Sequence, residues 1–313
     1  MVRLVHVSTV EWPKRRRTMD ENVKQALSLI DEASVERPDI VCFPENFPSS
    51  SMDTSAASTI PGPITDALGE KAKQHNMYVI CPMIKLEGER LYNAAALLDR
   101  GGKVVGKYRK IHPTIDELKM GITPGTSEHV FTTDFGKIGI VICFDIQYPG
   151  VAENLARNGA EIIFFPAEFP AQTYLKGIAW QYAVNVVSSI REPEAQIVDL
   201  AGCVVARGGG RGEEVDQQSP RDISYSKCAP VVSAILNLDC KRFEIDSNLD
   251  KVPMIRKKYG NKIDIRVFKP DDELVIASHS CYFWPTKNLT NNPRTGHSNR
   301  AEGLVRYIVV CRL

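Results

Sequence analysis

The sequence predicts an α/β protein arranged as a four-layer αββα sandwich with two mixed β-sheets. Strand-like apolar runs alternate with helical patterns, which indicates βα units. Short polar links at 87–90 ("EGER") and 99–103 ("DRGGK") join neighbouring strands as hairpins, so antiparallel pairs are expected in the same sheets. Two stretches, 39–47 ("DIVCFPENF") and 161–169 ("EIIFFPAEF"), match in character, which indicates equivalent strands in two halves of the sandwich.

Strands are expected where short apolar runs lie between turn residues. These runs are 2–8, 39–44, 77–84, 92–99, 103–108, 137–144 and 161–166. Helices are predicted, from apolar residues at helical spacing, at 19–34, 64–76 and 150–160 and once more after residue 240. In the first of them, Asp20 precedes the periodic apolar residues and is a suitable N-cap. The third ends at Gly159. We expect the helices to cover one face of each sheet.

Residues 208–230 break this pattern. The segment "GGGRGEEVDQQSPRDISYSKCAP" is glycine-rich, charged and without periodicity, which predicts a long loop or flap. Its glycine run lacks the Lys-Ser/Thr of a phosphate-binding loop. We expect one domain over 1–280, with a hairpin through 269–273. A C-terminal arm over 281–313 is expected to pack on this domain or on a second subunit, because apolar residues interrupt its polar sequence.

The overall charge argues against some classes of partner. The 313 residues include 39 Lys and Arg and 38 Asp and Glu, for a net charge of +1, so no long-range field favours nucleic acid or an anionic membrane. No apolar run approaches the roughly 20 residues of a membrane helix, and the N-terminus lacks the features of a signal peptide. Eight scattered cysteines without a CxxC pair predict reduced thiols rather than a zinc site. The expected location is cytoplasmic.

Three residues are candidates for catalysis because each comes near the end of a predicted strand, where α/β sheets gather their active sites. They are Glu45 after "DIVCFP", Lys110 after "KVVGKYR" and Cys143 in "GIVICFD". A thiol, a base that takes its proton and a cation that holds an anion can together perform nucleophilic catalysis.

The motifs around these residues occur in a recognisable order. "FPENF", "GKYRKIHP" and "GIVICFDIQYPG", together with "LYNAAALLDRGGKVVGKYRK" between the first two, resemble the nitrilase superfamily of carbon–nitrogen hydrolases, in its amidase or carbamoylase-like branch. The resemblance runs from about residue 2 to 170. It implies a nitrilase-like αββα fold, a Glu–Lys–Cys triad of Glu45, Lys110 and Cys143, no metal or cofactor, and a homodimer or higher homo-oligomer.

The resemblance also implies a role for each residue. Glu45 is the general base, and with Lys110 nearby it helps supply the thiolate of Cys143. Lys110 and the backbone N–H of Phe144 form the oxyanion hole. Glu117, in "KIHPTIDELKMG", matches a second glutamate of the family that orients the substrate or the lysine.

One further acidic residue is assigned from the echo of the Glu45 stretch. Ala167 stands where Glu45 stands, and Glu168 follows it. We expect Glu168 to be a pocket acid that selects polar or cationic substrates; the alternative is a solvated loop residue.

The expected activity is hydrolysis of a non-peptide carbon–nitrogen bond in a small linear amide or N-carbamoyl compound, through a thioester, with release of ammonia or an amine. The alternatives are a nitrilase that converts a nitrile to acid and ammonia, and a non-catalytic binding member of the same fold. Gln147 and Gly150 stand where amidase-type members commonly have Arg and Glu, so an anchor for a carboxylate is missing. A cysteine protease with a Cys–His pair that includes His112 is disfavoured, because no cysteine-protease signature accompanies this histidine.

Overall fold

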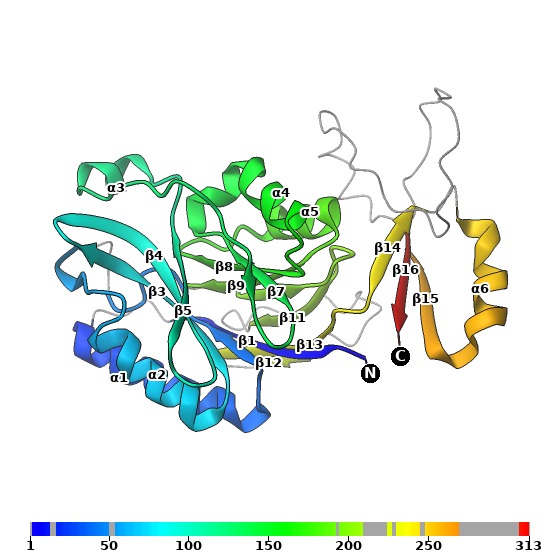
Figure 1. The fold of residues 1–313 in the computed structure, drawn as a ribbon, viewed down its shortest axis with the longest axis horizontal. Helices are drawn as coiled ribbons and strands as arrows, with labels where there is room; N and C mark the ends of the chain where they lie inside the picture. The colour runs from blue at the N-terminus through cyan, green and yellow to red at the C-terminus, as the bar shows by residue number, and fades with distance from the viewer. Residues whose placement is uncertain are drawn as a thin grey trace.

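The fold is that of a computed structural model, which describes residues 2–12, 17–49, 54–191, 194–208, 224–226, 230–244, 248–268 and 307–312. Two mixed sheets pack face to face in it, with helices on their outer faces (Figure 1). The four-layer αββα sandwich predicted from the sequence is therefore confirmed.

The first sheet has six strands within the described residues, in the order β13-β1-β2-β3-β4-β5. Their bounds are β1 Leu4–Val10, β2 Ile40–Cys42, β3 Tyr78–Glu87, β4 Arg90–Leu98, β5 Val104–Arg109 and β13 Val231–Asn237. Strands β1, β2 and β3 are parallel, whereas β4, β5 and β13 add antiparallel pairs. Helices α1 (Met19–Ala33) and α2 (Pro63–His75) pack on the outer face of this sheet (Figure 1).

The second sheet has seven strands within the described residues, in the order β12-β11-β10-β9-β8-β7-β6. Their bounds are β6 Phe131–Thr132, β7 Lys137–Ile140, β8 Ile162–Ala167, β9 Asn185–Ile190, β10 Gln196–Val198, β11 Val204–Gly208 and β12 Ser224–Ser226. Strands β7, β8 and β9 are parallel. Helices α4 (Pro149–Arg157) and α5 (Gln172–Tyr182) cover the outer face of this sheet (Figure 1).

The interface between the sheets is held by apolar packing and by buried hydroxyl groups. Residues of both sheets, such as Val7 and Val187, belong to one buried cluster. The hydroxyl of Ser189 in β9 lies 2.8 Å from the carbonyl oxygen of Val10 and 2.9 Å from that of Cys42. Since buried polar groups are costly without partners, these bonds stabilise one arrangement of the two sheets and of the strand ends that carry the site.

The structure corrects three local expectations. Helix α1 has Thr18 as its N-cap, in a capping box with Glu21, and Asp20 lies in its first turn. Strand β7 ends at Ile140, so Cys143 begins a 3-10 helix, η3 (Cys143–Gln147), instead of ending a strand. Within the predicted loop 208–230, residues 224–226 form β12, which pairs with β11. Most of that loop lies outside the described residues.

The C-terminal part forms a further sheet of three strands within the described residues, in the order β14-β16-β15. The strands are β14 Lys241–Glu244, β15 Ile263–Phe268 and β16 Tyr307–Arg312, and helix α6 (Val252–Tyr259) packs beside them (Figure 1). Strand β16 pairs with strands on both of its sides. A domain boundary at residue 280 stays a prediction, because 269–306, with the expected hairpin at 269–273, lie outside the described residues.

The sequence predicted reduced cysteines, and the structure contradicts this prediction at one position. Cys42, Cys81, Cys143 and Cys203 are free, but Cys240 is disulfide-bonded.

No helix of the described part is both long and apolar enough to cross a membrane.

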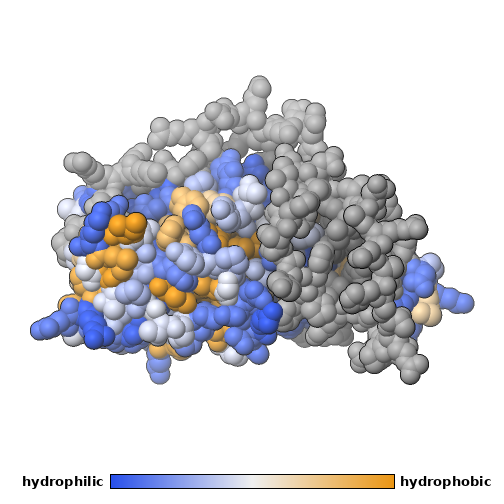
Figure 2. Space-filling view, turned by 90° about the horizontal axis from the view of Figure 1, so that it is seen from above, coloured by the Kyte–Doolittle hydropathy of each residue, from blue (hydrophilic) through white to orange (hydrophobic). Residues whose placement is uncertain are grey.

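On α3 (Ile115–Lys119), Ile115 and Leu118 are exposed. Figure 2, which looks down on the upper side of the view in Figure 1, shows apolar groups scattered between hydrophilic ones. Homo-oligomer formation stays a prediction.

Candidate active site

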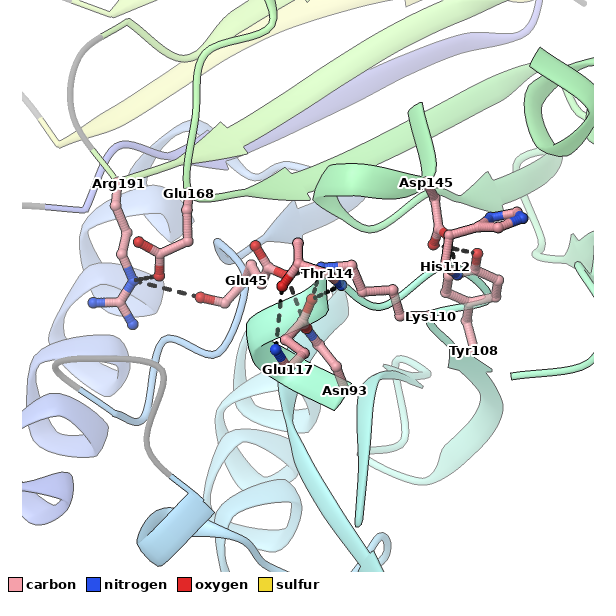
Figure 3. A network of polar contacts seen from close by, with 10 residues as sticks. All are labelled: Glu45, Asn93, Tyr108, Lys110, His112, Thr114, Glu117, Asp145, Glu168 and Arg191. Atoms are coloured by element: carbon pink, nitrogen blue, oxygen red, sulfur yellow. Dashed lines mark hydrogen bonds and ion pairs between the residues drawn. The ribbon is translucent and has the colours of Figure 1, made fainter. Parts of the chain in front are cut away.

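Glu45 lies in a loop three residues beyond the end of β2, and its side chain is only 1% exposed. Its Oε1 atom accepts hydrogen bonds from Lys110 Nζ at 2.8 Å and from Asn93 Nδ2 at 2.7 Å (Figure 3). Asn93 belongs to β4, and Lys110 directly follows β5. Two neighbouring antiparallel strands of the first sheet therefore supply the donors that fix this carboxylate.

Lys110 lies between two carboxylates. Its Nζ atom also donates to Glu117 Oε2 at 2.8 Å, and Glu117 accepts from the backbone N–H of Thr114 in the capping box of α3. Asn93 Nδ2 lies 2.6 Å from Glu117 Oε1, so the same amide bridges Glu117 and Glu45. Figure 3 shows these side chains converging from β4, β5, α3 and the loop after β2.

The charge on Lys110 is secured by this arrangement. Burial acts to lower its pKa, but the negative charges of Glu45 and Glu117 outweigh burial and raise it above the ordinary value. An ammonium group has three N–H donors. Two of them bind Glu45 and Glu117, so within the described residues one is left for a substrate oxygen.

Cys143 opens the 3-10 helix η3 with a φ of 46°, in the left-handed region that non-glycine residues rarely adopt. Such strained turns between a strand and a helix are typical of exposed nucleophiles. Phe144, the next residue, is half-buried, and its N–H is the first amide after the thiol. The turn therefore brings the sulphur and this amide to the end of the second sheet that faces the Glu45 loop.

Ionisation of the Cys143 thiol is disfavoured by its surroundings. Burial raises the pKa of Cys143 well above its usual value, and the charge of Glu45 raises it further. Lys110 and the backbone N–H of Glu168, which donates a hydrogen bond to the sulphur, act in the opposite direction without cancelling this rise. A thiol in this state must lose its proton to a base as it attacks.

A third buried carboxylate, Asp145, holds the turn of Cys143 against the end of β5. Asp145 is fully buried and accepts a hydrogen bond of 2.7 Å from the Tyr108 hydroxyl and another of 2.7 Å from the backbone N–H of His112 (Figure 3). The imidazole of His112 stacks on Tyr148. His112 is thus directed toward Asp145, while its neighbour Lys110 reaches the two glutamates.

Glu168, at the end of β8, is 36% exposed and forms an ion pair of 2.9 Å with Arg191 Nε (Figure 3). The Arg191 side chain is 4% exposed. It also contacts backbone oxygens of the loop that carries Glu45. Glu168 therefore has a cation beside it already, which the sequence did not predict.

All six residues singled out from the sequence lie in or beside this constellation: Glu45, Lys110, Glu117, Cys143, Phe144 and Glu168. Sequence reasoning missed Asn93 and Arg191. A polar Asn93 within the otherwise apolar run "YNAAALL" is a signal that could have been used. Arg191, directly after the apolar strand "NVVSSI", is a comparable signal. Within the described ranges, no group of three or more His, Cys, Asp or Glu side chains is placed to hold a metal ion.

Comparison with known proteins identifies the family. The family model described as carbon-nitrogen hydrolase matches residues 6–207. The chain is 30% identical over 263 residues to omega-amidase NIT2 of Mus musculus, covering 74% of this chain and 94% of that protein. It is 34% identical over 172 residues to a nitrilase of Pyrococcus abyssi, covering 52% and 65%.

Solved structures show the same fold. Nit3 of Saccharomyces cerevisiae, a member of branch 10 of the nitrilase superfamily, has a TM-score of 0.62 at 19% identity, covering 82% of this chain and 95% of that one. An amidase from Nesterenkonia sp. has a TM-score of 0.62 at 15% identity, covering 75% and 91%. The chain belongs to the carbon–nitrogen hydrolase family of the nitrilase superfamily.

Proposed function

We propose that this carbon–nitrogen hydrolase is a cysteine-dependent amidase acting on a small linear amide or N-carbamoyl compound. The observation that carries the proposal is the convergence of Glu45 and Lys110 on Cys143, with both charges acting on the thiol. The base, the nucleophile and a cation for the developing oxyanion are thus together in one buried place.

In the first half of the reaction, Glu45 takes the proton of the Cys143 thiol as the sulphur attacks the carbonyl carbon. The S–C bond forms while the C=O π pair moves onto oxygen. Lys110 Nζ and the N–H of Phe144 bind this oxyanion. The C–N bond then breaks, and ammonia or an amine leaves with the proton that Glu45 carried, so that a thioester remains on Cys143.

In the second half, water replaces the leaving group. Glu45 takes a proton from the water as its oxygen attacks the thioester carbon, and the same two donors hold the oxyanion. The C–S bond breaks, the acid leaves, and the sulphur regains its proton from Glu45. One carboxylate therefore serves both steps, which requires that its position be held throughout the cycle.

The substrate class rests on the relatives and on the residues near Cys143. The mouse relative is an omega-amidase, which supports an amide substrate. Gln147, where amidase-type members commonly have Arg, is exposed on η3. Glu168 lies beside the nucleophile, paired with Arg191. This polar surrounding fits an amide or carbamoyl group. The assignment of Glu168 as an acid that selects cationic substrates remains part of the proposal.

The test is ammonia or amine release from a panel of amides, N-carbamoyl compounds and nitriles. We expect turnover of an amide or carbamoyl compound and loss of roughly four to six decades of rate in Cys143→Ala. Cys203→Ala removes another free cysteine and serves as the control, with expected wild-type rates. Wild-type activity in Cys143→Ala would contradict the mechanism, and turnover of nitriles alone would favour the nitrilase alternative.

A further inference from the structure

Arg191 occupies an unusual place for an arginine. It follows the last residue of β9, in the second sheet, and its side chain is 4% exposed. From there it extends to the loop after β2, in the first sheet. A buried guanidinium requires several acceptors, because its desolvation is costly. The acceptors of the Arg191 guanidinium show which segments of the chain it connects.

On one side, Arg191 binds the loop of Glu45. Its Nη2 atom donates to the carbonyl oxygens of Asn46 at 2.6 Å and Ser49 at 2.5 Å, and Nε makes a longer contact of 3.5 Å with the carbonyl oxygen of Glu45. Asn46 has a φ of 46°, so the backbone directly after Glu45 is held in a left-handed conformation. The guanidinium therefore binds the loop on both sides of this strained residue.

On the other side, Arg191 binds the segment that contacts the nucleophile. Its Nε atom lies 2.9 Å from Glu168 Oε1 (Figure 3). The backbone N–H of Glu168 donates to the sulphur of Cys143. One side chain thus connects the residue that contacts Cys143 with the loop that carries Glu45. These two segments come from different sheets, at the ends of β8 and β2.

We propose that Arg191 is a positioning residue, which holds the Glu45 loop against the end of β8 and so keeps the Glu45 carboxylate within reach of the Cys143 thiol. This inference rests on the proposed function, in which Glu45 is the base. The planar guanidinium suits the task, since its fixed fork of donors binds several acceptors at defined angles. A lysine carries the same charge but has no such fork.

A double-mutant cycle on the reactivity of Cys143 tests the inference. The rate constant for alkylation of Cys143 by iodoacetamide is measured at one pH in the full-length wild type, Arg191→Met, Glu45→Gln and the double variant. Because the charge of Glu45 raises the pKa of the thiol, and iodoacetamide reacts with the thiolate, we expect both single variants to speed alkylation, Arg191→Met by up to about tenfold. If Arg191 acts through Glu45, adding Arg191→Met to Glu45→Gln changes the rate by less than about twofold.

Turnover gives a second readout. On the substrate found in the panel, Arg191→Met is expected to lower kcat by about 30- to 100-fold, because a displacement of about 1 Å has this effect, and to leave KM within about threefold. Arg157→Met removes an arginine that pairs with Glu153 on α4, outside the network, and is the matched control with unchanged kcat expected. Circular dichroism and thermal unfolding monitor the fold of every variant.

Arg191→Lys covers the case in which Arg191→Met does not fold. It keeps the charge and most of the volume, and we expect it to speed alkylation by about threefold, with no further change in the Glu45→Gln background. A wild-type alkylation rate in Arg191→Lys overturns the inference. An equal change by the Arg191 variants with and without Glu45→Gln also overturns it, because the effect then does not pass through Glu45.

The two proposals fail in different ways. If Glu45→Gln leaves both alkylation and turnover at wild-type values, Glu45 is not the base and the proposed function is contradicted. If Glu45→Gln changes both but the Arg191 variants change neither, the proposed function stands and only the positioning role of Arg191 is lost.

Discussion

The ends of β2 and β8 share a sequence pattern and differ in chemistry. Each strand has parallel partners on both sides in its own sheet, and each runs into a Phe-Pro pair with a glutamate nearby. Glu45 comes directly after its proline and is 1% exposed, whereas Glu168 comes one residue later and is 36% exposed. The comparison shows that a repeated strand can be followed by a buried carboxylate bound to a lysine in one copy and by a partly exposed ion pair in the other.

The donors around the two carboxylates account for this difference. Glu45 is bound by Lys110 and Asn93, both nearly fully buried, so that its charge acts within a low-dielectric site. Glu168 is bound by Arg191, and partial exposure to water screens its charge. We therefore expect equal substitutions at the two positions to have unequal effects.

The largest expected difference is between Glu45→Gln and Glu168→Gln. Both changes keep the size of the side chain and remove its charge. Glu45→Gln should lower kcat by roughly two to four decades, because it removes the proposed general base, and Glu168→Gln by less than about tenfold. Ammonia release under saturating substrate measures both. Equal losses in the two variants would remove the distinction drawn here.

Lys110→Met tests what makes the Glu45 position different. It leaves two buried carboxylates, Glu45 and Glu117, without the cation between them, and it removes the proposed oxyanion donor. We expect a loss of roughly two to three decades in kcat and about 3–5 kcal/mol in the free energy of unfolding. Lys119→Met, which removes an exposed ion pair with Asp116, is the control. A stable, active Lys110→Met protein would argue against this account.

Asn93→Ala should have a smaller effect. The change removes the amide that bridges Glu45 and Glu117, so each carboxylate loses one hydrogen-bond donor. We expect about 1–3 kcal/mol of destabilisation, measured by denaturant unfolding, and a reduction of about tenfold in kcat. Asn158→Ala, at the exposed end of α4, provides the comparison. An unchanged kcat would mean that Lys110 alone is sufficient to hold Glu45.

The smallest expected effect is a change in acid stability on Glu117→Gln. Burial acts to raise the pKa of Glu117, but Lys110 and the bonds from Asn93 and Thr114 outweigh it and lower the pKa. Its stabilising contribution is therefore present above the unfolded pKa of about 4.3 and is lost as the pH falls through the folded value. The midpoint temperature of thermal unfolding should fall less steeply between about pH 6 and pH 3 in Glu117→Gln than in the wild type.

Asp116→Asn is the control for this measurement, because it removes the adjacent, exposed carboxylate of α3. We expect its unfolding curve to follow that of the wild type over the same pH range. A wild-type slope in Glu117→Gln would contradict the lowered pKa of this group.

The sequence was sufficient to predict the sandwich and the placement of Glu45, Lys110 and Cys143 near strand ends. Strand periodicity and turn residues are local signals, and the ordered motifs added the catalytic triad. The same signals could not predict that β7 ends before Cys143, because the change from strand to 3-10 helix occurs within one apolar run. Nor could they predict the raised pKa of Cys143, since its burial depends on both sheets.

What the sequence determined by itself was which chemical groups this protein carries and on which elements they lie. The tertiary structure alone decided which of them meet. Lys110 and Glu45 are 65 residues apart, and Arg191 and Asn46 are 145 residues apart, yet both pairs form hydrogen bonds. The physical reason is that periodicity and capping act over a few residues, whereas the positions of charges and carbonyl groups depend on how the two sheets pack.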